Sequence, residues 1–110
     1  MSDKTVKAEA LSQKQKKHLK GLAHSLSPVV LIGKEGLSSG IVNTINAELL
    51  NHELIKVKIG NTSGLEKHST CAAITEQTEG NLVQLIGKTI ILYKANPKKD
   101  KEKRIRLPKG

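Results

Sequence analysis

Residues 29–36 read VVLIGKEG, and the interpretation of the whole chain starts from this stretch. Its first four residues are apolar and mostly β-branched, which is the pattern of a strand covered on both faces. Two glycines then bracket Lys34 and Glu35 in a turn. A helix is expected directly afterwards, because Ser38 or Ser39 can cap one. A buried strand, a glycine turn and a helix in this order predict an α/β domain.

The flanking sequence supplies the other elements. Ser12 and Gln15 have capping-box spacing, so a basic amphipathic helix should begin at Ser12 and end before the Ser27-Pro28 pair. Periodicity and turn residues predict a second helix ending near residues 51–52, a strand at 54–59, a third helix at 65–79, and strands at 82–86 and 89–94. Gly87 and Lys88 between the last two strands favour a type II′ hairpin turn. The predicted order is therefore α-β-α-β-α-β-β.

This order predicts a mixed four-stranded sheet packed with helices. Strands joined through helices should lie parallel with right-handed crossovers, and the closing hairpin adds an antiparallel strand. A chain of 110 residues suffices for one core. We expect a flexible leader at 1–10, the folded domain at 11–95 and a basic tail at 96–110. The tail is predicted to be disordered, although Ile105 and Leu107 offer an alternative in which it pairs along a sheet edge.

Charge narrows the class of partner. The chain has 19 Lys and Arg against 10 Asp and Glu, a formal net charge of +9, which favours polyanions such as nucleic acid and leaves acidic proteins possible. The sequence shows neither an apolar membrane span nor a secretory signal, and the single cysteine, Cys71, fits a reducing compartment. We therefore expect a cytoplasmic protein. Tyr93 is the only aromatic residue, so recognition by aromatic stacking platforms is not expected.

The Gly33-Lys34-Glu35-Gly36 loop is the first candidate binding site. Backbone amides without side-chain bulk, followed by the positive end of a helix dipole, can bind a phosphate, and Lys34 adds a charge. A G-x-x-G sequence alone is also compatible with an ordinary left-handed turn. The position of this loop between a strand and a helix, in a basic chain, favours binding to a phosphate backbone.

Two further lysine groups are candidates. The first helix carries Lys14, Lys17 and Lys20 on its exposed surface, where they either contact a polyanion or form an ordinary solvated face. In the strand at 54–59, Lys56 and Lys58 share one face. They extend the binding surface if no helix covers that face; otherwise their aliphatic stems extend past the core toward solvent.

Catalytic and metal-binding patterns have little support. His68 and Cys71 have a spacing that can hold a metal, but no second pair follows at ligand spacing. No nucleophile, base and orienting group form a recognisable constellation. We therefore predict no metal, no cofactor and no enzymatic activity. A small enzyme that uses His68, Cys71 or Tyr93 is the least favoured alternative.

Several ordered motifs together resemble the CRM domain (chloroplast RNA splicing and ribosome maturation), in its stand-alone bacterial YhbY-type form. The motifs are LSQKQ at 11–15, LSPVV at 26–30, IGKEGLS at 32–38, LIKVK at 54–58 and GKTIILYK at 87–94. The resemblance implies a fold similar to the C-terminal domain of the third bacterial initiation factor. It also implies RNA binding through Gly33, Lys34, Glu35, Gly36 and adjacent basic surface, without a cofactor.

The resemblance further implies association with ribosomal RNA in precursors of the large ribosomal subunit. The roles of Lys14, Lys17 and Lys20 rest on charge alone. In the KH module the G-x-x-G loop joins two helices, whereas here it follows a strand, so the likeness to KH is chemical. The alternative reading is a basic adaptor that binds an acidic protein.

Overall fold

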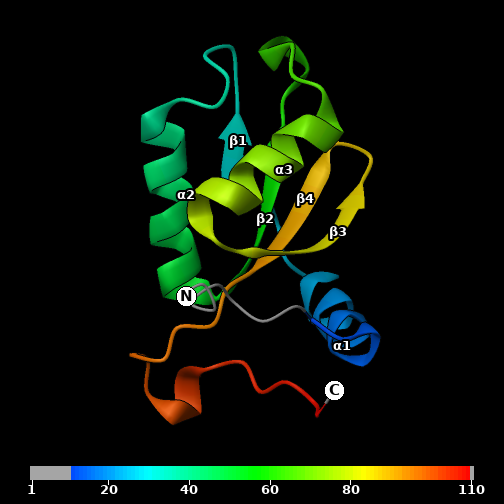
Figure 1. The fold of residues 1–110 in the computed structure, drawn as a ribbon, viewed down its shortest axis with the longest axis vertical. Coiled ribbons are helices and arrows are strands. Elements are labelled where there is room, and N and C mark those ends of the chain that lie inside the picture. Colours follow the sequence, from blue (N-terminus) through cyan, green and yellow to red (C-terminus); the bar gives the residue numbers. More distant parts are fainter. Residues whose placement is uncertain (1–10, 110) are drawn as a thin grey trace, which may run out of the picture.

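The computed structural model describes residues 11–109 and contains the predicted elements in the predicted order (Figure 1). These elements are α1 (Gln13–Ala23), β1 (Val30–Ile32), α2 (Ser39–His52), β2 (Leu54–Ile59), α3 (Lys67–Thr78), β3 (Asn81–Ile86) and β4 (Thr89–Tyr93). Short 3-10 turns occupy Asn61–Ser63 and Lys101–Lys103. The expected leader at 1–10 lies outside the described residues.

The four strands form one mixed sheet in the order β1-β2-β4-β3. β1 pairs parallel to β2, while β2 with β4 and β4 with β3 pair antiparallel. The predicted fold class is thereby confirmed. Gly87, in the turn between β3 and β4, has φ +57°, as the first central position of the predicted type II′ turn requires.

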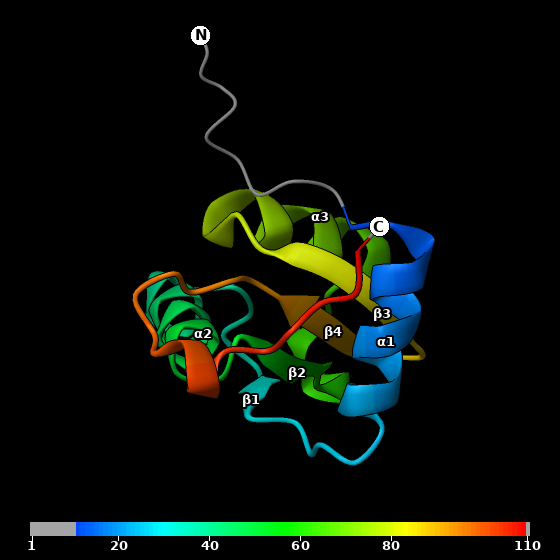
Figure 2. The same ribbon diagram turned by 90° about the horizontal axis from the view of Figure 1, so that it is seen from below.

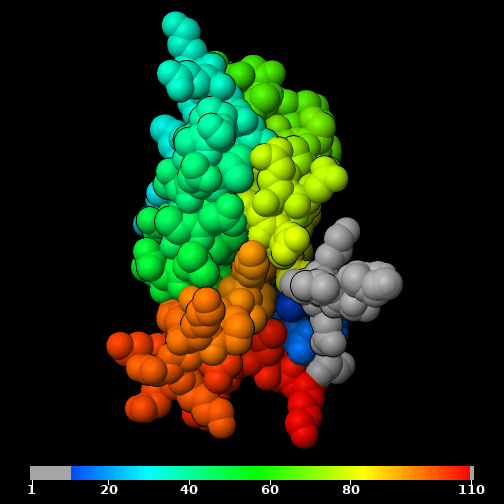
Figure 3. All heavy atoms as spheres, turned by 60° about the vertical axis from the view of Figure 1, so that its left-hand side comes forward, coloured from blue at the N-terminus to red at the C-terminus, as the bar shows by residue number. Residues whose placement is uncertain are grey.

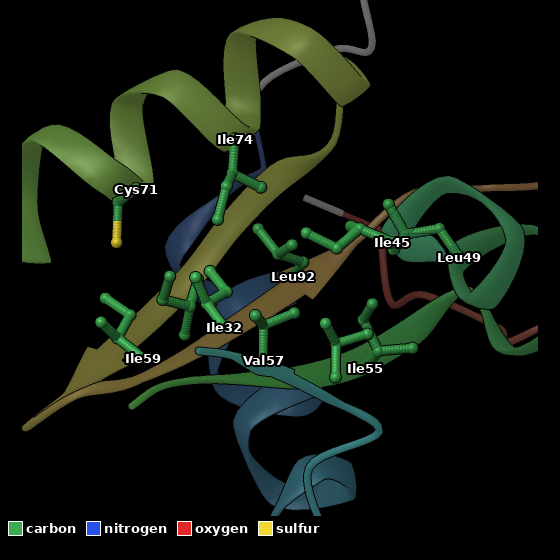
Figure 4. Packing of buried hydrophobic residues seen from close by; sticks show 11 residues of the cluster. Ile32, Ile45, Leu49, Ile55, Val57, Ile59, Cys71, Ile74 and Leu92 are labelled. Atoms are coloured by element: carbon green, nitrogen blue, oxygen red, sulfur yellow. The ribbon is translucent and has the colours of Figure 1, made fainter. Parts of the chain in front are cut away.

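Helices α2 and α3 cover one face of the sheet. Ile45 and Leu49 of α2, together with Cys71 and Ile74 of α3, point toward the strands in Figure 4. The strand side chains that meet them are buried, and they alternate along β2 as Ile55, Val57 and Ile59. This cluster is the main core.

Helix α1 covers part of the opposite face. Its buried Leu19 and Ala23 pack in a second, smaller cluster with side chains of the central strands and β3, namely Leu54, Val83, Ile91 and Tyr93. The helix begins as predicted, since the Ser12 hydroxyl accepts from the Gln15 amide at 3.1 Å and the Gln15 side chain accepts from the Ser12 amide at 3.0 Å. Three helices therefore enclose the sheet unequally, two on one face and one on the other.

The C-terminal segment was predicted to be disordered, but residues 96–109 pack against the rest of the domain. The segment starts beside the end of α2, where Asn96 and Lys99 donate to backbone carbonyls, and crosses the second face toward α1 (Figure 2). Ile105 and Leu107 pack partly buried against the second cluster. The side-chain amide of Gln15 donates to the Pro108 carbonyl at 3.0 Å. Within the described residues this segment forms no strand, so pairing along an edge is also not observed. Burial of two apolar side chains explains why a highly charged segment is ordered here.

Glu53 holds this segment in place. Its side chain is 1% exposed, and its two carboxylate oxygens accept from the backbone amides of Asn96 and Ile105, each at 2.7 Å. A buried carboxylate normally needs such partners, because burying an unpaired charge costs far more than the roughly 2–7 kcal/mol of an unpaired neutral polar group. Burial raises the pKa of the neighbouring Tyr93 hydroxyl, and the Glu53 carboxylate raises it further, while Arg104 opposes the shift. The loop between α2 and β2 thus connects the tail to the core.

Candidate nucleic-acid interface

The Gly33 to Gly36 loop is a tight turn that leads into α2. The Gly36 amide donates to the Gly33 carbonyl at 2.9 Å, and Lys34 and Glu35 are exposed at the tip. Gly36 is buried and has φ +70°, a backbone conformation that residues other than glycine rarely adopt. The turn therefore requires glycine at 36 for its backbone conformation.

Gly33 differs from Gly36 in what it contributes. No heavy atom lies within 4 Å of where a Cβ would stand, and its φ is not in the left-handed region. The fold would tolerate a side chain at this position. What glycine provides there is open access to the backbone, which a phosphate approaching the loop would use.

The beginning of α2 favours an anion near the loop. The Ser38 hydroxyl accepts from the Ile41 amide at 3.2 Å, and the first turn of α2 contains no acidic residue. The positive end of the helix dipole is therefore not neutralised by carboxylates of its own first turn. Lys34 and Glu35 cancel in formal charge, so attraction at the loop depends on backbone amides, the dipole and neighbouring lysines.

Two other turns meet the loop at the same end of the sheet. The Gly60 amide donates to the Ile32 carbonyl at 2.8 Å, and the Ile59 amide donates to the Lys88 carbonyl at 2.8 Å. The Lys88 ammonium also donates to the Asn61 side-chain oxygen at 3.1 Å. A Cβ at Gly60 would lie 2.8 Å from the Ile32 carbonyl oxygen, so glycine is needed for this close approach. The loop is thus supported by turns distant in sequence.

Lys88 is a candidate that sequence reasoning missed. It lies in a hairpin turn far along the chain from the G-x-x-G loop, and the sequence does not show that the two turns are neighbours. Antiparallel pairing of β4 with β2 brings that turn to the end of the sheet where β1 ends. Only the strand order, which the sequence leaves open, would have revealed this proximity.

The structure separates Lys56 from Lys58. Both lie on the face that carries α1, as their alternation with buried residues predicted. The Lys56 ammonium donates to the Leu26 carbonyl at 2.8 Å and thus holds the connection between α1 and β1. Lys58 is exposed nearer the loop end. Of the two, Lys58 is the better placed to contact a ligand bound at the loop.

The lysines of α1 are not beside the loop. Lys14, Lys17 and Lys20 are exposed, but α1 lies toward the opposite end of the long axis from the β1–α2 connection (Figure 1). The space-filling view shows this connection in cyan protruding at one end and the C-terminal segment in orange and red at the other (Figure 3). Because Gln15 contacts Pro108, the α1 lysines join the basic tail instead. The predicted site residues therefore form two basic regions.

Cys71 is a candidate for both metal binding and catalysis. Burial raises the pKa of the Cys71 thiol, and the Glu66 carboxylate raises it further, so the reactive thiolate is disfavoured. Among residues 11–109, no group of three or more His, Cys, Asp or Glu side chains is arranged to hold a metal ion. No helix in that part of the chain is long and apolar enough to cross a membrane.

Comparison with known proteins defines the class. The CRS1 / YhbY (CRM) domain family model matches residues 11–94, and the chain belongs to this family. A protein of Haemophilus influenzae named "RNA-binding protein" is 42% identical over 99 residues, covering 90% of this chain and 96% of the relative. A "probable RNA-binding protein" of Bacillus subtilis is 36% identical over 98 residues, covering 89% and 99%.

A solved structure supports the fold. The solution structure of a hypothetical protein from Staphylococcus aureus has a TM-score of 0.72 and 37% sequence identity, covering 89% of this chain and 99% of the other. The C-terminal residues that pack against α1 lie beyond the residues that the family model matches.

Proposed function

We propose that this protein binds RNA by its phosphate backbone through the Gly33–Gly36 loop and acts in the cytoplasm on ribosomal RNA of large-subunit precursors. The observation that carries the proposal is the geometry of the loop, which exposes glycine backbone at the beginning of a helix. The relatives named as RNA-binding proteins support RNA as the partner. The ribosomal assignment rests on the family resemblance.

Each part of the loop has a defined role in this proposal. The open backbone at Gly33 and the beginning of α2 receive a phosphate, and the ammonium groups of Lys34, Lys88 and Lys58 add attraction around it. Gly36 keeps the turn closed. Selectivity comes from the shape of folded RNA, and no chemical step is involved.

The direct test is the Lys34→Asp variant. Lys34 is exposed, so its replacement should leave the fold intact, whereas the two-charge change repels phosphates at the loop tip. We expect RNA affinity, measured by filter binding to a ribosomal RNA fragment, to fall about tenfold, which corresponds to about 1.4 kcal/mol. Lys67→Asp, on α3, is the matched charge control. Equal affinities of the folded Lys34→Asp variant and the wild type would refute the loop as the binding site.

Association with large-subunit precursors needs a separate measurement. Native protein in a cell lysate should migrate with large-subunit precursors on a sucrose gradient and should return to the top after nuclease treatment. Association that resists nuclease would point instead to an acidic protein partner.

A further inference from the structure

The loop end of the sheet has an uncovered surface on the face that carries α1. Strand pairing places Leu31 of β1 beside Lys58 of β2, Lys58 beside Thr89 of β4, and Thr89 beside Ile86 of β3. Residues paired across a sheet in this way point to the same face. These four side chains, here called the cross-sheet row, extend across all four strands.

The row is accessible because α1 packs on the other half of the face. The strand side chains in contact with α1 belong to the cluster containing Leu54, Val83, Ile91 and Tyr93, which lies away from the row. Leu31 is 61% exposed and Ile86 is 55% exposed, and Lys58 is also exposed. One exposed leucine would be ordinary, but two large apolar side chains in one row on an open face are not explained by packing.

The row adjoins the proposed phosphate-binding loop. Leu31 is two residues before Gly33, and the turn at Gly87 and Lys88 directly joins Ile86 to Thr89. Three strand spacings separate Leu31 from Ile86, roughly 14 Å at about 4.8 Å per spacing. A ligand that leaves the loop along this face therefore meets an apolar side chain, a lysine, a hydroxyl and a second apolar side chain.

We propose that the cross-sheet row binds unpaired nucleobases of an RNA strand whose backbone is held at the loop. This inference rests on the proposed function. Charge complementarity favours nucleic acid, because Lys58 within the row and Lys88 beside it suit phosphates between bases. Leucine and isoleucine side chains can pack on base faces, as apolar wedges do in other nucleic-acid complexes. The row supplies base contact to a chain that has no exposed aromatic platform.

The test compares two probes with the same phosphates. One is a labelled, unstructured oligoadenylate, and the other is an abasic oligomer of equal length. We expect the full-length protein to bind the oligoadenylate about tenfold more tightly, since base contacts are made only with it. The Leu31→Thr/Ile86→Thr double variant, which places threonine, a β-branched residue suited to strands, at both positions, should bind both probes equally. Its dependence on salt should match that of the wild type, because no charge is removed.

Control variants separate this inference from the proposed function. Leu50→Thr removes a leucine that is 56% exposed on α2. This variant should bind the oligoadenylate and the abasic oligomer as the wild type does. Lys34→Asp should weaken binding of both probes by the same factor, because it acts on phosphates. Thermal unfolding of each variant checks that the fold is retained.

Two results would overturn the role of the row. Either the wild type does not distinguish the two probes, or the double variant retains the wild-type preference for oligoadenylate. In both cases, weaker RNA binding by Lys34→Asp would still support the proposed function of the loop. Lys34→Asp could also leave the affinity for both probes unchanged while the double variant loses its preference for oligoadenylate. In that case the loop is not the phosphate-binding site, and the role of the row in base binding still stands. If acidic protein were the occupant, the double variant would bind both RNA probes as the wild type does, which also refutes the inference.

Discussion

The two glycines of the loop are required for different reasons. Gly36 adopts φ +70°, whereas Gly33 stands in open space with an ordinary backbone conformation. An alanine at 36 would have to adopt a strained left-handed backbone conformation, while the Cβ of an alanine at 33 would have no protein atom within 4 Å. The same residue type therefore serves folding at one position and access at the other.

This difference predicts opposite effects of two alanine substitutions. Gly36→Ala should lower the free energy of unfolding by about 1–2 kcal/mol, since its left-handed conformation disfavours a Cβ. Gly33→Ala should leave that free energy within about 0.5 kcal/mol of wild type but weaken RNA binding, because its methyl group blocks the exposed backbone. Urea unfolding and filter binding measure the two properties. Equal stability losses in both variants would contradict the assignment.

Glu53 illustrates a residue whose role is visible only in the tertiary structure. It has φ +64° at the end of α2, a position often occupied by glycine, yet its carboxylate is buried and accepts two amides of the C-terminal segment. The interactions of the carboxylate compensate for backbone strain of about 1–3 kcal/mol.

Glu53→Gln should therefore destabilise the protein and release residues 96–107. An amide nitrogen would face a backbone N–H, leaving a buried donor unsatisfied at a cost of about 1–3 kcal/mol. Urea unfolding measures the stability, and hydrogen exchange at the Ile105 amide measures release of the segment. Glu48→Gln, at a partly exposed carboxylate 3.3 Å from His52, is the control and should change neither. Unchanged exchange at Ile105 in Glu53→Gln would disprove the anchoring role.

At the scale of elements, helix caps determine where the helices begin. Ser12 and Ser38 cap α1 and α2 as the sequence predicted. The third helix begins two residues later than predicted because Glu66 is its N-cap, accepting from the His68 amide at 2.8 Å and the Ser69 amide at 2.9 Å. Glutamate is a less common cap than serine or aspartate, so the sequence did not indicate it.

The cap at Glu66 predicts a dependence of stability on pH. Hydrogen bonds from the amides of His68 and Ser69 lower the pKa of this carboxyl. A lowered folded-state pKa means that the stabilisation is present above the unfolded-state pKa and is lost as pH falls through the folded-state value. The melting temperature of Glu66→Ala should accordingly be lower than that of wild type at pH 7, and the gap should narrow toward pH 3. A gap that is constant over this range would exclude titration of the cap.

At the scale of the whole molecule, basic groups gather at both ends of the long axis. One end contains the loop with Lys34 and Lys88, and the other combines the α1 lysines with the ordered C-terminal segment. This arrangement was not predicted, because the sequence placed the loop and α1 in one surface. In the proposed function, each end would neutralise phosphates independently.

Salt dependence should reveal both regions. RNA affinity should fall steeply as salt increases, because each neutralised phosphate releases counterions, with a slope of about 0.7 per contact for a single strand. Replacing Lys14 and Lys17 by glutamine should reduce the slope for a long RNA and leave it unchanged for an oligomer that reaches only the loop. The slope can be measured by titration at several salt concentrations. A flat affinity in wild type would argue against phosphate binding altogether.

The sequence by itself determined the element order, the mixed sheet, the first two helix caps and the G-x-x-G turn. These features depend on local periodicity, caps and glycine conformations, which are encoded within a few residues of each element. The family likewise follows from motifs in order along the chain. For the same reason, alternation along β2 placed Lys56 and Lys58 on one face correctly.

Only the tertiary structure decided which of these residues meet. The strand order brings Lys88 to the loop and aligns Leu31 with Ile86, while packing of α1 on half a face leaves that row open. The tertiary contacts also order the C-terminal segment, because Ile105 and Leu107 are partly buried and the Glu53 carboxylate accepts a backbone amide of this segment. Such contacts join residues tens of positions apart, and their formation depends on the energy of the whole packed arrangement, which no local pattern contains.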